Sequence, residues 1–337
     1  MLEPQDPPGA MFRRARAPIS ALLSIAMGTS LNAGNVLADS APPAAAQVGY
    51  TSNTFSSDFV SSDLTASIVD KKNTKNRGFK WYLWNLFSAQ ADPDNVVLNS
   101  DGTVTLLGTP AQNGQIVTAV TYTGTNSFAG TAFGGGAYFE AEMKFDPKTV
   151  EANGGVDNWP AFWALQIEGN VTGSAQWPGQ SSQYIHSVEA DFFEAGHYNP
   201  LPLESGYGGS LHDWYGVRNK TCGSGLCQAK MTFGDAFRVV PTGTNFNQFH
   251  RYGFLWVPAT SSSAGYAKFY FDGQQLGPAQ QWTLYANQAP PAEGQPWAFG
   301  IIDQRHLFLI LGTGKGQPLT IRSVNAWQKG AGSNWSY

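Results

Sequence analysis

From residue 55 onward, the chain consists of short apolar runs separated by glycine, asparagine, aspartate, proline and serine. No helical period continues for more than about two turns. Glycine accounts for 38 of the 337 residues and aromatic residues for 13 %, a composition typical of short strands joined by tight turns. The pattern predicts an all-β sandwich of two antiparallel sheets over residues 55–337. The clearest strands are expected at 96–98, 103–107, 137–145, 267–271 and 319–327, with turns at Asp101-Gly102 and Asp272-Gly273.

The first 54 residues have a different composition. Three arginines between residues 13 and 16 precede the apolar stretch 19–27, which is too short to span a bilayer. This order is typical of an export signal peptide, which we place over residues 1–38. Residues 39–54 are rich in proline, alanine and serine, and are predicted to be a disordered linker. We therefore expect a secreted or periplasmic monomer with no transmembrane segment.

The charge of the chain restricts its partners. The net charge is −4, and no basic cluster occurs beyond the N-terminal arginines, so nucleic acid is not expected as a partner. The sequence contains no Gly-x-Ser-x-Gly motif, which argues against a serine hydrolase of that type. The 11 tryptophans suit sugar binding by stacking, although most of them are expected to fill the core of a sandwich.

Residues 189–194 concentrate three carboxylates in a segment otherwise made of alanine and phenylalanine. Aromatic residues favour a strand, and the side chains of a strand alternate between its two faces. Glu189 and Asp191 therefore share one face, while Phe192 lies on the apolar face. Strict alternation would place Glu194 on the apolar face as well. One extra residue, a β-bulge, returns it to the acidic face.

Three carboxylates on one face of a strand have a specific chemical use. Like charges held close together raise the pKa of at least one carboxyl, which leaves a protonated acid beside an ionised carboxylate. Cleavage of a glycosidic bond requires this pair. A solvated acidic face or a calcium site are the alternatives.

The two cysteines, Cys222 and Cys227, are separated by four residues. In an exported protein, such a pair predicts a small loop disulfide. A zinc site would need two more ligands near by, and none is evident in the sequence. A pair of free thiols remains open.

The acidic segment resembles the catalytic signature of glycoside hydrolase family 16. Glu189-x-Asp191-x-x-Glu194 has the bulged spacing of the laminarinase-like members of this family. Five other segments resemble the family in order and type; they are residues 136–144, 158–163, 249–256, 269–273 and 321–327. The resemblance covers residues 135–328, and extends more loosely from Phe55.

This resemblance implies a β-jelly roll with a concave substrate cleft and a retaining, endo-acting hydrolase of β-linked polysaccharides, with β-1,3-glucan as the first substrate. It implies that Glu189 is the nucleophile, Glu194 the acid/base and Asp191 an auxiliary acid between them. No cofactor is needed for this chemistry, no metal site is assigned, and a structural calcium away from the cleft is allowed. Ala190 and the Phe192-Phe193 pair depart from the common pattern, which leaves the substrate open.

Four further residues are candidates for contact with the polysaccharide. Trp159 and Trp163 match family positions next to the catalytic strand, and we expect at least one of them to stack on sugar. His212 and Trp214 lie in the glycine-rich stretch 206–216, which is predicted to be a long loop. The alternative for each is ordinary packing.

Two other functions remain open at the level of the sequence. A transglycosylase uses the same carboxylates but transfers the sugar to a hydroxyl instead of water. A non-catalytic carbohydrate-binding sandwich shares the architecture, and fold does not fix function. A pure binder has no need for the complete acidic triplet, which favours the enzyme.

Overall fold

The computed structural model describes residues 40–64, 77–84, 90–108, 112–122, 127–152, 160–168, 184–195, 205–222, 225–233, 237–285, 299–312 and 318–336. In some of these stretches, such as 215–222 and 225–233, only the backbone is described. Ala38–Tyr337 form one compact unit. The signal peptide expected over 1–38 lies outside the described residues. Among the described helices, none is long and apolar enough to span a membrane.

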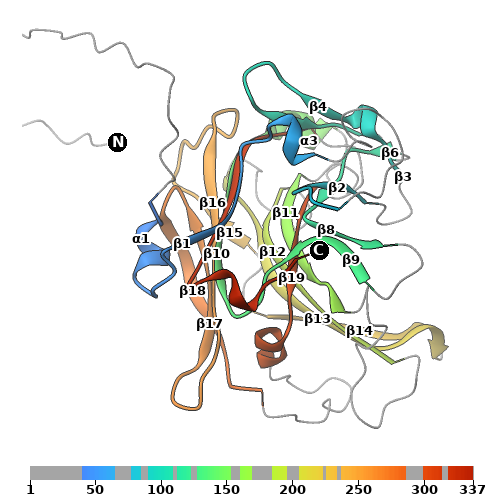
Figure 1. Ribbon diagram of the computed structural model, residues 1–337, viewed down its shortest axis with the longest axis vertical. Helices are drawn as coiled ribbons and strands as arrows, with labels where there is room; N and C mark the ends of the chain where they lie inside the picture. The colour runs from blue at the N-terminus through green and yellow to red at the C-terminus, as the bar shows by residue number, and fades with distance from the viewer. Residues whose placement is uncertain are drawn as a thin grey trace, which may run out of the picture. The chain divides into compact units, whose positions relative to one another are not determined.

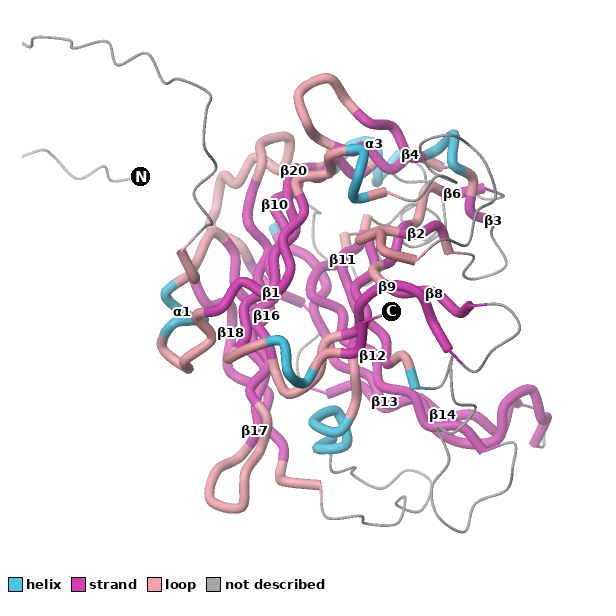
Figure 2. Tube along the Cα trace, in the orientation of Figure 1, coloured by secondary structure: helices cyan, strands magenta, loops and turns pink. Residues whose placement is uncertain are grey.

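Two large antiparallel sheets form a β-jelly-roll sandwich, which confirms the predicted fold class (Figures 1 and 2). The first sheet has the order β18-β17-β16-β10-β20-β5-β4, with β1 also paired to β20, and the second has the order β14-β13-β12-β11-β19-β7-β2, with β15 paired to β13. The strands of the first sheet are β1 Ser52–Ser57, β4 Val96–Leu98, β5 Val104–Leu106, β10 Ala137–Lys144, β16 His250–Val257, β17 Gly265–Phe271, β18 Gln274–Trp282 and β20 Leu319–Gln328. Those of the second are β2 Tyr82–Leu83, β7 Ile116–Val117, β11 Ala161–Gln166, β12 Tyr184–Glu194, β13 Gly206–Cys222, β14 Gly225–Phe233, β15 Phe237–Val239 and β19 Leu307–Leu311.

Smaller elements accompany the two sheets. A three-stranded sheet has the order β21-β9-β8, and a parallel pair joins β3 to β6. Their bounds are β3 Gln90–Ala91, β6 Gln112–Asn113, β8 Ala119–Tyr122, β9 Ser127–Ala132 and β21 Trp335–Ser336. The described α-helices are α1 Pro43–Ala46 and α3 Pro147–Ala152, and the described 3-10 helices are η1 Ser61–Asp63, η2 Pro93–Asn95, η4 Phe299–Gln304 and η5 Ala331–Ser333.

The predicted strands and turns are present. The hairpin β4–β5 turns at Asp101-Gly102, and the hairpin β17–β18 turns at Asp272-Gly273. Gly102 has a φ of 81° and Gly273 a φ of 79°, in the left-handed region that favours glycine. The sequence pattern therefore identified both turns by the backbone conformation that they require.

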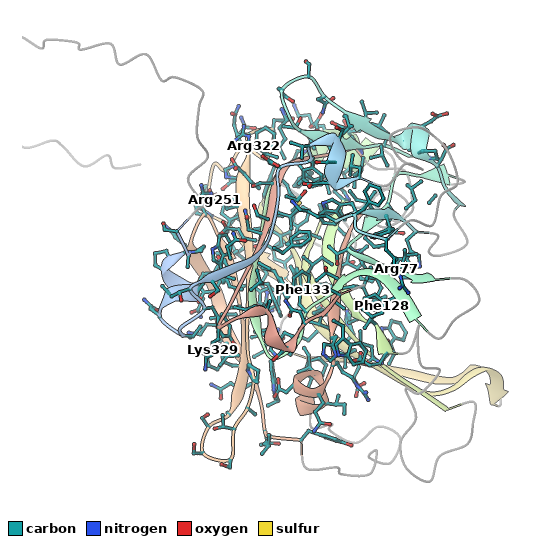
Figure 3. The ribbon with its side chains drawn as sticks, viewed as in Figure 1. Arg77, Phe128, Phe133, Arg251, Arg322 and Lys329 are labelled. Carbon is teal, nitrogen blue, oxygen red and sulfur yellow. The ribbon has the colours of Figure 1, made fainter. Side chains whose placement is uncertain are left out.

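The main core lies between the two large sheets, and the apolar face of β12 is at its centre. The ring of Phe192 stacks on that of Phe254 in β16 with 4.3 Å between centroids, and on that of Phe139 in β10 with 5.5 Å. Phe133, which is fully buried, contacts Phe139 at 5.3 Å and lies between the sheets, whereas Arg251 and Arg322 lie on the outer side of the first sheet (Figure 3). The packing anchors β12 so that its other face carries the acids.

The prediction of a disordered linker over 39–54 is wrong for the described residues 40–54. Helix α1 and the first residues of β1 occupy this stretch, and β1 pairs with β20. Ala45 is fully buried, and the Tyr50 hydroxyl donates to the carbonyl oxygen of Trp256 at 3.1 Å. Tyr50 and Ala45 pack on an aromatic patch that includes Trp327 on the outer face of the first sheet. Small alanines fit closely against such a patch. The burial of their apolar surface stabilises an ordered conformation, although the composition of the stretch is typical of a disordered linker.

The prediction of a loop over 206–216 is also wrong, because this stretch belongs to strand β13. Its glycines serve close packing. A Cβ built on Gly206 would lie 2.0 Å from the carbonyl oxygen of Arg238 in β15, and one built on Gly209 would lie 3.0 Å from the ring of Phe269. Glycine in a strand often marks such an approach of another backbone or ring.

Gly206→Ala is expected to lower the free energy of unfolding by about 1–3 kcal/mol, because the new methyl group must push β13 away from β15. Gly330→Ala is the matched control, since nothing lies within 4 Å of the Cβ it would add. Urea denaturation of both variants measures the difference. Equal stability of the two variants would contradict the close packing of β13 against β15.

Candidate active site

Strand β12 contains the β-bulge that the sequence predicts. Asp191 pairs with Ser210 and Glu194 with Gly208, so the stretch between these two pairs has one more residue in β12 than in β13. Against β11, Asp191 lies opposite Trp163 and Glu194 opposite Ala161, again with one extra residue on β12. Because Ala161 and Trp163 share a face of β11, all three carboxylates project from the same face of the sheet.

The bulge has a physical cause in the two consecutive phenylalanines. Phe192 and Phe193 are both buried in the core between the sheets, and Phe193 contacts Tyr252 with 4.4 Å between ring centroids. Burial stabilises the fold by about 1.5–3 kcal/mol for each ring. In a regular strand one of the two rings would lie on the acidic face, and its contribution would be lost. The bulge buries both rings and thereby returns Glu194 to the acidic face.

Strand β13 places hydrogen-bond donors opposite two of the acids. His212 pairs with Glu189, and Ser210 with Asp191. The Ser210 hydroxyl donates to Asp191 Oδ2 at 3.1 Å, and His212 Nε2 lies 3.0 Å from the same oxygen. The Trp214 indole N–H donates to Glu189 Oε2 at 3.2 Å, while His212 Nε2 lies 4.0 Å from Glu189 Oε1. Alternate residues of β13 therefore place a hydroxyl, an imidazole and an indole opposite the first two carboxylates.

The surroundings of Glu194 differ from those of Glu189. The residues directly opposite Glu194 on the neighbouring strands are Gly208 and Ala161, which have no polar side chain. Glu194 is 9 % exposed, and 16 % of the Glu189 side chain is exposed. The two glutamates thus share a face but have different neighbours across the sheet.

Trp163 lies on the same face as the carboxylates but is packed into a second apolar cluster. It is 4 % exposed, and its indole N–H donates to the carbonyl oxygen of Gly312 at 2.8 Å. Its cluster includes Ile310 and Phe308 of β19. Core packing accounts for Trp163, and the prediction that it stacks on sugar stays untested. Trp159 lies outside the described residues.

The other predicted residues have the following positions. His212 is 1 % exposed and Trp214 is partly buried, and both contact carboxylates of β12. Cys222 ends β13 and pairs across the strands with Gly225 of β14, and Cys227 lies in β14. The side chains of both cysteines lie outside the described residues, so the disulfide stays a prediction. The concave cleft expected over the acidic face also stays a prediction.

Glu189, Asp191 and His212 also form a candidate metal site. One ligand atom from each lies within 4.8 Å of the others. However, His212 Nε2 is at hydrogen-bond distance from both Asp191 Oδ2 and Ser210 Oγ. A nitrogen that donates a proton to a carboxylate has no lone pair left for a metal, so the hydrogen-bonded arrangement and metal binding exclude each other at this atom.

Ser210 is the residue of this site that the sequence did not indicate. Its signal was present as the alternation Ser210-x-His212-x-Trp214, which places a hydroxyl, an imidazole and an indole on one face of a strand. The surrounding glycines favoured a loop. In a loop, unlike in a strand, alternate residues do not share a face, so the alternation predicts no common position for these side chains.

No protein-family model matches the sequence, and neither does any curated protein. Among solved structures, an endo-1,3-beta-glucanase from Streptomyces sioyaensis is 17 % identical over 85 % of this chain and 97 % of its own, with a TM-score of 0.44. Alginate lyase vAL-1 from Chlorella virus is 8 % identical over 69 % and 88 %, with a TM-score of 0.33. Lectin I from Ulex europaeus is 8 % identical over 74 % and 92 %, with a TM-score of 0.30. These similarities are too distant to carry an argument, so the function rests on the chain's own residues.

Proposed function

We propose that this protein is a retaining endo-β-glycosidase of the glycoside hydrolase family 16 type, which hydrolyses a β-linked polysaccharide, with β-1,3-glucan as the first candidate. One observation carries the proposal: the bulge in β12 turns Glu189, Asp191 and Glu194 to one face of the sheet. Cleavage with retention needs two carboxyl groups about 5–5.5 Å apart on such a face.

The hydrogen bond from Trp214 to Glu189 supports the role of Glu189 as the nucleophile. Donors favour the ionised form of a carboxylate, and the indole N–H of Trp214 donates to Glu189. The ionised role, that of the nucleophile, therefore falls to Glu189. The protonated role, that of the acid/base, then falls to Glu194, the second glutamate on the same face of the sheet.

The reaction then has two steps. Glu194 donates its proton to the glycosidic oxygen as the bond to the anomeric carbon breaks, and Glu189 forms an ester with that carbon. Glu194, now ionised, takes a proton from a water molecule whose oxygen attacks the anomeric carbon and releases Glu189. Asp191 lies between the two glutamates in the chain, and its negative charge favours retention of the proton on Glu194 in the free enzyme.

Incubation of the wild type with a panel of polysaccharides is expected to release reducing ends from at least one β-linked glucan, with random internal cleavage. Glu189→Gln keeps the shape of the side chain but removes the nucleophile, so we expect it to release none. EDTA should leave the wild-type rate unchanged, because no step requires a metal.

The other outcomes separate the alternatives. Products longer than the starting chains would identify a transglycosylase. A wild type that binds a glucan but cleaves no member of the panel would identify a non-catalytic binding protein, and would overturn the enzyme. Loss of activity in EDTA with recovery on addition of a divalent ion would show a metal requirement, at the candidate metal site or at a structural calcium site. The predicted monomeric state and export belong to the same proposal, and size-exclusion chromatography and fractionation of the host cells test them.

A further inference from the structure

Three atoms from three side chains form a closed triangle beside the carboxylates. Asp191 Oδ2 lies 3.1 Å from Ser210 Oγ and 3.0 Å from His212 Nε2, and Ser210 Oγ lies 3.0 Å from His212 Nε2. All three residues are buried, and the His212 side chain is 1 % exposed. The triangle is therefore closed to solvent and to a sugar.

The number of available protons restricts how this triangle is arranged. The serine hydroxyl has a single proton, and it donates this proton to Asp191 Oδ2. An ionised carboxylate has no proton to give. The two short contacts of His212 Nε2, to Asp191 and to Ser210, then both require the proton to be on Nε2.

We propose that His212 is a positioning residue that keeps its proton on Nε2 and, together with Ser210, fixes the Asp191 carboxylate in place. This inference rests on the proposed function, because its consequence is for the glycosidase reaction. Glu189 loses its negative charge when it forms the ester. An Asp191 held by two donors neither turns into the space beside the ester nor takes the proton of Glu194.

The sequence suggested that His212 contacts the sugar, and the geometry favours a different role. A ring with 1 % of its surface exposed cannot offer a face to a pyranose. A proton on Nε2 also excludes His212 as a metal ligand through this atom, which separates the proposal from the candidate metal site.

Nitrogen-15 NMR of the full chain tests the position of the proton without any assay of activity. The chain has 5 histidines, and the signal lost in His212→Gln identifies that of His212. We expect its Nε2 to be protonated at neutral pH and to be unaffected by added Zn²⁺ or Ca²⁺. An unprotonated Nε2, or a shift of its signal on binding either metal, would overturn the proposal.

Kinetics then test the consequence for catalysis. His212→Gln places an amide nitrogen near the position of Nε2 and should retain kcat to within about tenfold, whereas His212→Leu removes the donor and should lower kcat by roughly 100-fold or more, since small displacements of catalytic groups have effects of this size. KM should change little in either variant, because His212 does not contact the substrate. Ser210→Ala leaves the His212–Asp191 contact in place and should cost less than His212→Leu.

The results distinguish this proposal from the function on which it rests. A folded His212→Leu with unchanged kcat, or a folded His212→Gln as impaired as His212→Leu, contradicts the positioning role; thermal unfolding identifies the folded variants. A rise in KM without a change in kcat would point to direct sugar contact and also contradicts it. If the wild type cleaves no polysaccharide, the proposed function fails, while the NMR experiment still decides where the proton lies.

Discussion

In the presence of azide, Glu189→Ala and Glu194→Ala are expected to give glycosyl azides of opposite anomeric configuration. Removal of the Glu189 carboxylate leaves a space on the face from which the nucleophile attacks. A small anion in that space attacks the anomeric carbon directly while Glu194 protonates the leaving group, so a single displacement inverts a β-linked substrate into an α-glycosyl azide.

Glu194→Ala should behave differently, because Glu189 can still form the ester when the leaving group needs no proton. With an activated aryl glycoside, the ester accumulates for want of a general base to activate water. Azide needs no base, and it attacks the ester from the opposite face to give a β-glycosyl azide after two displacements. The anomeric configuration of the product therefore reports directly which glutamate has which role.

Without azide, both variants should lose at least about 10⁴-fold in kcat on a polysaccharide, since each lacks a group that takes part in bond making or proton transfer. Glu142→Ala is the matched control and should leave kcat unchanged. Glu142 forms an ion pair with Arg322 on the other large sheet, away from the acidic face. Product configurations that are exchanged between the two variants would reverse the assignment of the roles. Identical products from both would exclude a double displacement by this pair.

The sequence predicted the acidic face because its physical basis is local. The spacing of Glu189, Asp191 and Glu194 fits one face only if the strand bulges, and the Phe192-Phe193 pair supplies the apolar burial that stabilises the bulge. The alternation of side chains along a strand and the residue preferences of turns both act over a few residues. One sequence is therefore enough to recognise them.

The donors opposite the acids could not be predicted in the same way. Whether Ser210 and His212 face Asp191 and Glu189 depends on the register between β12 and β13, which is set by the whole sheet. The glycines of β13 favour a loop when the sequence is considered alone. Their place in a strand is explained by packing, because Gly206 lies close to the backbone of Arg238. Likewise, residues 40–54 are ordered only because an aromatic patch from distant strands lies beneath them.

Asp303→Ala is expected to lower the free energy of unfolding by about 3–5 kcal/mol, although Asp303 lies away from the acidic face. This carboxylate joins three elements. Its Oδ1 accepts from the indole N–H of Trp256 at 2.8 Å, and its Oδ2 accepts from the backbone N–H of Ala259 and the indole N–H of Trp282, both at 2.8 Å. Its removal leaves three donors, two of them on the buried Trp256 and Trp282, without an acceptor.

Asp303→Asn is the matched control for this loss. Its amide oxygen can accept from Ala259 and Trp282, while its NH₂ group faces the N–H of Trp256, so one hydrogen bond is lost and the loss should be about 1–3 kcal/mol. Urea denaturation of the wild type and the two variants measures the order. Equal losses in both variants would mean that packing volume, and not hydrogen bonding, explains the effect.

The pH dependence of the same measurement tests the environment of Asp303. Burial raises the pKa of its carboxyl, against the three N–H donors that lower it. The folded state then holds this proton more tightly than the unfolded chain, so the contribution of Asp303 to stability falls as the pH rises from the unfolded pKa, about 3.9, through the higher folded value. The advantage of the wild type over Asp303→Asn, which does not titrate, should therefore shrink as the pH rises above about 4. An advantage that grows over this range would mean that the three donors outweigh burial.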